Sequence, residues 1–114
     1  GAGSHCLALA ARGVPAEGVD ACAAAVEVMG ARGVVAHQRS LWALTDLERC
    51  STVLLLMNTI GCVGNVDGLL RFLRHMHCAT GPGCHVLLDV SLPDWEALGG
   101  APVCRAAGRA AGRR

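Results

Sequence analysis

One unbroken apolar run constrains the fold of this chain more than any other stretch. Residues Val53 to Met57 read VLLLM, and a polar, glycine-containing loop follows directly, up to Asn65. An apolar run without alternation is typical of a strand that is buried on both faces, as in a parallel sheet covered by helices. Ligands of such sheets bind beyond the carboxyl ends of the strands. The sequence therefore predicts a core strand followed by a ligand-facing loop that contains Asn58, Thr59 and Gly61.

Length and charge narrow the class of protein. The 114 residues suffice for one small domain with a real core. Ten basic residues, all Arg, stand against nine acidic ones, for a net charge of +1. A nucleic-acid binder would carry an excess of clustered basic residues, so neutral partners or small molecules are expected instead.

The cysteines and the start of the chain bear on its compartment. The seven cysteines are odd in number and contain no C-x-x-C pair, which favours reduced thiols that pack as small hydrophobes. The opening GAGSHCLALAARG lacks the basic leader of a signal peptide, and no apolar run has the roughly 20 residues of a membrane span. We therefore expect a cytoplasmic protein without membrane contact.

Helical and extended patterns alternate along the chain. Helices are expected at residues 6–11, 21–31 and 66–78, and strands at residues 14–20, 34–37, 53–57 and 85–90. Residues 41–49 predict a connector with at most one helical turn, and Gly81-Pro82-Gly83 predicts a turn. This order predicts an α/β fold with a doubly wound parallel sheet. The last 22 residues, 93–114, are rich in Ala, Gly and Arg and predict an irregular or disordered tail after a domain at 1–92.

Local signals predict the N-caps and apolar faces of the expected helices. Ser4 is the expected N-cap of the first helix and Asn65 of the third. Helical spacing predicts the buried face of the third helix, formed by Val66, Leu69, Leu70, Leu73 and Met76. Cys22, Ala25, Val26 and Met29 are the corresponding apolar residues of the second helix.

Further candidates for ligand contact lie before the apolar run. Gly1 and Gly3 lead directly into a helix, an arrangement that lets the backbone approach a ligand, although an ordinary flexible terminus is the simpler explanation. Asp20 lies 17 residues after Gly3. This is close to the sequence spacing of about 20 residues at which nucleotide-binding folds place the carboxylate that accepts the ribose hydroxyls. Asp20 is also a plausible N-cap for the following helix. Trp42 suits either a pocket wall or core packing.

In combination, these segments resemble the class I S-adenosylmethionine-dependent methyltransferases over about residues 1–90. The segments that carry the resemblance are GAGSHCLALAARG, VPAEGVDACAAAVEVMGARGV, STVLLLMNTIGCVGNVDGLLRFLRHMH and GPGCHVLLDV. The resemblance implies a Rossmann-like, three-layer α/β/α fold and S-adenosylmethionine as cofactor. It implies a small-molecule methyl acceptor and cofactor contacts from Gly1, Gly3, Asp20, Ala21, Ser40, Leu41, Asn58, Thr59 and Gly61.

The chain departs from the family pattern at several places. The first strand and the first glycine of the cofactor loop would precede Gly1, Ser40 stands where an acid is usual, and Cys84 replaces a glycine. The two final antiparallel strands have no clear counterpart. We therefore expect an incomplete sheet, truncated at both ends, with possible self-association through its open edges.

The function and the catalytic chemistry stay open at this point. Methyl transfer needs mainly alignment of the two reactants, and no general base can be named among the five histidines. Cys78, Cys84 and His85 lack the paired spacing of a zinc site, so no metal is expected. A non-catalytic remnant of the same fold is the first alternative, and another nucleotide-binding module, such as a dehydrogenase fragment, is the second.

Overall fold

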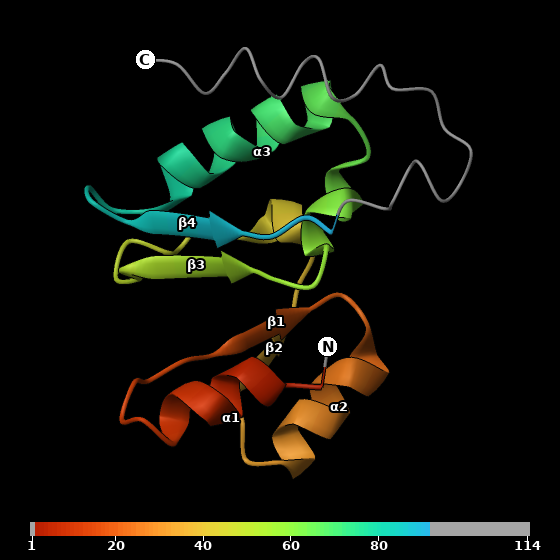
Figure 1. Cartoon of the computed structure of the whole chain (residues 1–114), viewed down its shortest axis with the longest axis vertical. Coiled ribbons are helices and arrows are strands. Elements are labelled where there is room, and N and C mark those ends of the chain that lie inside the picture. The colour runs from red at the N-terminus through yellow and green to blue at the C-terminus, as the bar shows by residue number, and fades with distance from the viewer. Residues whose placement is uncertain (1, 92–114) are drawn as a thin grey trace.

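The computed structural model describes residues 2–91, and within this range helices and strands alternate (Figure 1). The helices are α1 (Ser4–Ala10), α2 (Ala23–Ala31) and α3 (Val66–Ala79), with 3-10 turns η1 (Leu41–Ala43) and η2 (Thr59–Val63). The strands are β1 (Gly18–Asp20), β2 (Ala36–Gln38), β3 (Thr52–Leu55) and β4 (His85–Leu88). The predicted α/β class is confirmed, as is the single helical turn in the connector. The tail expected at 93–114 lies outside the described residues.

The strands form two separate parallel pairs. β1 pairs with β2 from Gly18 opposite Ala36 to Asp20 opposite Gln38, and β3 pairs with β4 from Thr52 opposite His85 to Leu55 opposite Leu88. Figure 1 shows α1 and α2 beside the first pair and α3 along the second. The parallel direction predicted from the alternating order is confirmed, while the strands of residues 2–91 make two ladders instead of one sheet.

The first half of the fold is built around Met29. This side chain of α2 is 2 % exposed and lies against two glycines that leave room for it. A Cβ at Gly18 would lie 2.4 Å from Met29 Sδ, and one at Gly3 would lie 3.0 Å from Met29 Cγ. Val34, which precedes β2, is also buried. Small residues on β1 and before α1 therefore let α2 approach closely.

The second half has the larger core. Phe72 and Met76 of α3 are the most deeply buried large side chains, and Leu55 of β3 packs against them. The other buried members of this cluster are Leu44 and Ala79. Full burial of side chains of this size contributes about 1.5–3 kcal/mol each. The contact between α3 and the β3–β4 pair is therefore the main source of stability among the described residues.

In the second pair only β3 contributes a buried residue, on one face, and β4 is at most half-buried, so the prediction of burial on both faces is wrong. Leu55 is 4 % exposed and Val53 and Val86 pack against the core, whereas Leu54 is 39 % and Leu87 is 52 % exposed. Side chains alternate between the faces of a strand, and α3 covers the face that Leu55 occupies. The opposite face of the pair carries exposed leucines.

The buried face of α3 differs from the predicted one. Met76 is buried and Leu69 packs against the core, as expected, but Val66, Leu70 and Leu73 are exposed. The buried residues of the helix are instead Gly68, Phe72, Met76 and Ala79. Phe72 is the largest side chain of this helix, so its burial rotates the face away from the leucine-rich side.

Three helix starts test the predicted caps. Asn65 is the N-cap of α3, as predicted, and its Oδ1 accepts a hydrogen bond of 2.8 Å from Gly68 N. The N-cap of α1 is Gly3 at φ +78° instead of Ser4, which lies inside the helix. The N-cap of α2 is Cys22 instead of Asp20.

Candidate functional site

The predicted cofactor residues that the structure describes lie close to strand ends or helix starts. Asp20 ends β1, Ser40 and Leu41 follow β2, and Asn58 follows β3. Gly3 precedes α1 and Gly61 lies within η2. Gly1 is outside the described residues.

Asp20 is part of the turn between β1 and α2. Its Oδ1 accepts a hydrogen bond of 2.9 Å from Cys22 N, and its backbone carbonyl accepts one of 3.1 Å from Arg39 N. The side chain of Gln38 donates to the carbonyl of Ala21 over 3.3 Å. These bonds bring the carboxyl ends of β1 and β2 together, so Asp20 and Ala21 lie beside the segment that leads to Ser40.

Gly3 has a packing role that is visible in its backbone. Its φ of +78° lies in the left-handed region, and an added Cβ would also meet Val34 at 3.1 Å. Its carbonyl accepts the first hydrogen bond of α1, from Leu7 N. The guanidinium of Arg32 donates to the Ala2 carbonyl and, over 3.4 Å, to Ser4 Oγ. Arg32 therefore holds this glycine loop against the end of α2.

Ser40 and Leu41 have separate structural roles. Ser40 Oγ accepts from Trp42 N over 3.3 Å and is the N-cap of η1. The half-buried side chain of Leu41 packs against the core of the second half. Ser40 thus lies near the end of β1, whereas the side chain of Leu41 packs against the core cluster that contains Phe72 and Met76 of α3.

Trp42 packs on α3 and is 42 % exposed. Its ring centroid lies 5.9 Å from that of His75, and the Arg71 guanidinium lies 5.5 Å from its ring centroid. Such a cation over an aromatic face is worth about 0.5–1 kcal/mol at an exposed site. The side chain therefore contributes to packing between the connector and α3.

The loop after β3 has an unusual backbone. Met57 and Asn58 are consecutive residues with positive φ, at 60° and 61°. Thr59 Oγ1 donates to the Leu56 carbonyl over 2.6 Å, and Gly61 N donates to the Asn58 carbonyl over 2.9 Å. A Cβ at Gly61 would meet nothing within 4 Å. The loop is tightly bonded internally and open to solvent at its glycine.

Sequence reasoning missed Asp89, which contacts this loop from the next strand. Asp89 follows β4, and its two carboxylate oxygens accept from the backbone N–H groups of Met57 and Asn58. These two hydrogen bonds, with a smaller contribution from the charge of His5, hold the pKa of Asp89 below its usual value. The signal was available in HVLLDV, because the ends of neighbouring parallel strands meet at one edge of a sheet.

Histidines and cysteines do not assemble a metal centre in residues 2–91, where no group of three potential ligands was found. His37 Nε2 of β2 instead pairs at 2.7 Å with Oε2 of Glu17, the residue before β1. His75 Nε2 is buried next to a cavity of about 70 Å³, and no hydrogen-bond partner for it is found within residues 2–91. None of these histidines lies in the Asn58 loop.

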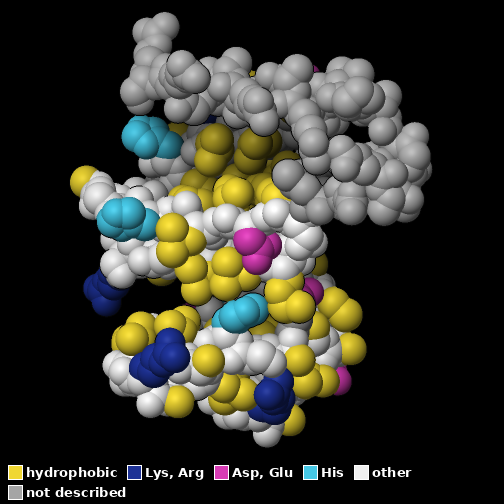
Figure 2. Space-filling model, viewed as in Figure 1, with side chains coloured by type: hydrophobic (Ala, Val, Ile, Leu, Met, Phe, Trp, Pro, Cys, Tyr) yellow, Lys and Arg dark blue, Asp and Glu magenta, His cyan; other side chains and the backbone are white. Residues whose placement is uncertain are grey.

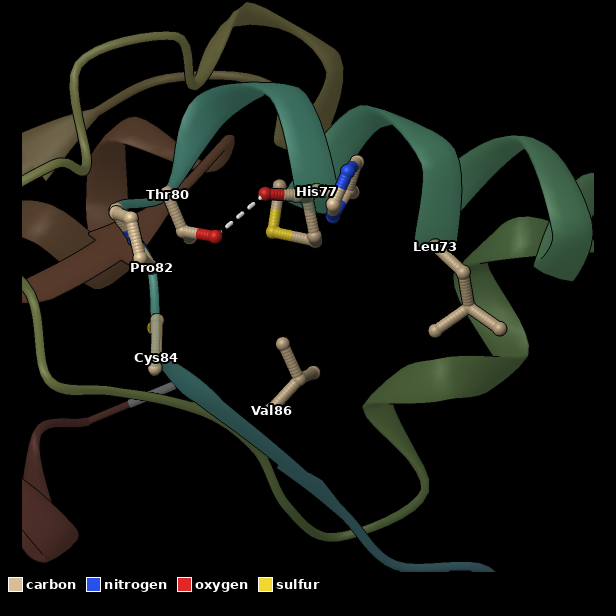
Figure 3. Close-up of a pocket in the computed structure, with 9 residues that line it drawn as sticks. Leu73, His77, Thr80, Pro82, Cys84 and Val86 are labelled. Atoms are coloured by element: carbon tan, nitrogen blue, oxygen red, sulfur yellow. Dashed lines mark hydrogen bonds between the residues drawn. The ribbon is translucent and has the colours of Figure 1, made fainter.

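A groove of about 400 Å³ lies between α3 and β4 (Figure 3). Leu73 and His77 of α3 line one side, and Pro82, Cys84 and Val86 line the other. Because Pro82 and Cys84 precede β4, the groove is at the amino end of that strand. It is thus distant along the strand from Asp89 and the Asn58 loop.

Side chains of different kinds are mixed on the face of the molecule shown in Figure 2. In Figure 2, hydrophobic side chains are visible on both halves, and the basic side chains are scattered without forming one patch on this face. No helix in residues 2–91 has the length and apolarity needed to cross a membrane.

In comparisons with protein-family models, with curated proteins and with solved structures, no match to this chain was found.

Proposed function

We propose that this chain is a S-adenosylmethionine-dependent methyltransferase domain of Rossmann-like, three-layer architecture that acts on a small molecule. The alternation of helices with parallel strand pairs is compatible with this fold. The proposed family rests on the resemblance of the four sequence segments to the class I methyltransferases. The positions of Asp20 and Asn58 after β1 and β3 support the proposed cofactor site.

The observation that carries the proposal is the carboxylate at the carboxyl end of β1. Asp20 is oriented by Cys22 N, and the end of β2 lies beside it through the bond from Arg39 N to the Asp20 carbonyl. In α/β folds that bind nucleosides, an acid at this strand end accepts the ribose hydroxyls. In the proposed complex Asp20 holds the ribose, while Ala21, Ser40 and Leu41 lie next to the adenine.

The methyl group would be presented on the side of the Asn58 loop. In the proposed complex Gly3 contacts the methionine part of the cofactor, as Gly1 would, and Asn58, Thr59 and Gly61 face the sulfonium and the methyl acceptor. Methyl transfer is an in-line displacement at carbon, so the main contribution of these residues is alignment of the acceptor with the methyl group. No residue is assigned as a base.

Substitution of Asp20 tests the proposal. Calorimetric titration of the wild type with S-adenosylmethionine and S-adenosylhomocysteine should show binding, and titration with NAD should show none. Asp20→Ala should weaken nucleoside binding by about 30-fold or more, because hydrogen bonds to a charged group contribute about 1.5–3 kcal/mol each.

Glu27→Ala is the matched control, since Glu27 is an exposed acid on α2. This variant should bind like the wild type. Equal affinity of Asp20→Ala and wild type would remove Asp20 from the ribose role, and binding of NAD alone would instead indicate a dehydrogenase-type module.

A non-catalytic relative of the same fold is the second candidate, and one observation favours it. The strands of residues 2–91 form two short pairs, and leucines such as Leu54 and Leu87 are exposed on the uncovered face. A domain with such surfaces would serve as an interaction module without a ligand. Absence of binding to S-adenosylmethionine, S-adenosylhomocysteine and NAD, in a folded sample, would favour this candidate over the enzyme.

A further inference from the structure

The backbone of the Asn58 loop adopts a conformation that needs outside support. Met57 and Asn58 both have φ near +60°, although neither is a glycine. Left-handed backbone is sterically costly for residues with a Cβ, less so for Asn than for Met. Two such residues in succession persist only where surrounding groups over-determine the conformation.

Asp89 supplies this support through both oxygens of its carboxylate. Oδ2 accepts from Met57 N at 2.9 Å and Oδ1 accepts from Asn58 N at 2.7 Å, so one carboxylate bonds both left-handed residues. The position of Asp89 is itself set by the strand register, because Asp89 N donates to the Leu55 carbonyl directly after the pairing of Leu55 with Leu88. The β3–β4 ladder therefore places the carboxylate under the loop.

The side chain of Asn58 is oriented by the same segment. Its Oδ1 accepts a hydrogen bond from Ser91 N, two residues after Asp89. Since this bond uses the carbonyl oxygen of the amide, the amide nitrogen is the atom that Asn58 can offer to a ligand as a donor. The segment from Asp89 to Ser91 thus determines both the backbone and the side-chain orientation of Asn58.

We propose that Asp89 is a positioning residue that fixes Met57 and Asn58 in the left-handed conformation, so that the Asn58 side-chain amide donates a hydrogen bond to the substrate that receives the methyl group. The two hydrogen bonds from Met57 N and Asn58 N to the Asp89 carboxylate are called the carboxylate clamp. The identity of the bound substrate rests on the proposed methyltransferase function, whereas the clamp does not. The acceptor class that suits an amide donor is an oxygen-bearing molecule, such as a phenol or a carboxylic acid.

The clamp can be tested without any ligand. In the wild type, the amide protons of Met57 and Asn58 should resonate downfield by NMR and move upfield together as the pH falls through the pKa of Asp89, which lies below the usual value. The charge of His5 in α1 also acts on Asp89, so His5→Gln should be measured in parallel, and in this variant the two amide protons should still move together with acid. If the chemical shifts of these two amide protons do not change with pH in this range, the role of the Asp89 carboxylate is refuted.

Two substitutions of Asp89 and one control sharpen the test. Asp89→Asn keeps one acceptor oxygen and should retain one of the two bonded amides, whereas Asp89→Ala should lose both and speed amide exchange at Met57 and Asn58 by about tenfold or more. Asp67→Asn, on the exposed first turn of α3, should leave both amides unchanged. Equal exchange in wild type and Asp89→Ala, with both folded, would refute the role.

Ligand binding separates this inference from the function on which it rests. For phenol- and carboxylate-bearing methyl acceptors, presented with S-adenosylhomocysteine, Asn58→Ala and Asp89→Ala should each raise Kd about tenfold, and the double variant should be no worse than either single variant. Additive losses would contradict positioning through Asn58. Failure of the wild type to bind S-adenosylhomocysteine would remove the proposed function, while the amide measurements would still decide the clamp.

Discussion

At the scale of single residues, three carboxylates hold loops that follow strands. Asp20 closes the turn after β1 through Cys22 N, and Asp89 closes the loop after β3 through Met57 N and Asn58 N. Asp46 pairs with Arg39 at 2.7 Å between β2 and β3. In each case a charged acceptor satisfies backbone or side-chain donors at a place where no ladder continues.

These carboxylates predict the direction of the pH dependence of stability. The Arg39 guanidinium lowers the pKa of Asp46, and the two loop N–H groups lower that of Asp89. A carboxyl whose pKa is lower in the folded than in the unfolded chain contributes stability that is complete above the unfolded value, near 3.8, and is lost as the pH falls through the folded value. We expect the midpoint of urea unfolding to decline below about pH 4.

The contribution of Asp89 to this decline can be isolated. Asp89→Asn removes the titrating group, so its unfolding midpoint should be lower at pH 6 but should fall less steeply between pH 4 and pH 2 than that of the wild type. Asp67→Asn should retain the wild-type slope. Identical slopes for Asp89→Asn and wild type would show that the bonds to Met57 N and Asn58 N contribute nothing to acid stability.

At the scale of elements, α3 and the turn before it form the tightest contact. The N-cap bond from Gly68 N to Asn65 Oδ1 starts the helix, and a Cβ on Gly68 would lie 1.9 Å from the carbonyl oxygen of Val63 in η2. Phe72, one turn later, is completely buried. The helix therefore approaches the η2 turn at a distance that only glycine permits.

Two glycine-to-alanine substitutions should shift stability in opposite directions. Gly68→Ala should destabilise by about 2–4 kcal/mol, since overlap with backbone must be relieved by moving α3 or η2. Gly30→Ala in α2 should stabilise by about 0.5–1 kcal/mol, because an added Cβ meets nothing within 4 Å and alanine favours helix. Chemical denaturation measures both. A neutral Gly68→Ala would mean that α3 does not pack against η2 as described.

At the scale of the whole molecule, the strands of residues 2–91 form two short pairs that carry exposed apolar side chains. Val19 on β1, Leu54 on β3 and Leu87 on β4 are between 39 % and 52 % exposed. Edge strands with apolar side chains are templates for pairing with other chains. Each half has its own small core, around Met29 in the first half and around Phe72 and Met76 of α3 in the second. The stability of the molecule therefore depends on two small cores and short strands.

We therefore expect marginal stability and self-association. Sedimentation velocity should show a rising average mass between about 5 and 200 µM, and thermal unfolding should be broad or irreversible. Leu54→Lys together with Leu87→Glu should reduce association by adding charge to the exposed face of β3 and β4, and Arg74→Lys on α3 serves as a control. A monomer at all concentrations with a sharp, reversible transition would contradict this expectation.

The sequence by itself determined the kinds of elements, their order and several of their ends. Uninterrupted apolar runs and helical spacing predicted strands and helices where β1, α2, β3, α3 and β4 lie, and Asn65 predicted the start of α3, because caps and propensities are local. Predicted strands were too long at β1, which begins at Gly18 instead of Val14, since ladder length depends on a partner strand.

Only the tertiary structure decided which faces are buried and which loops are held. Helical spacing predicted Leu73 on the buried face of α3, whereas the structure exposes Leu73 and buries Phe72 in one cluster with Leu55. Trp42 became a partner of Arg71 and His75, and Asp89 became the support of the loop after β3. These pairs lie about 30 residues apart along the chain, and no local pattern encodes such contacts, because they depend on how the strands are registered and how the helices pack.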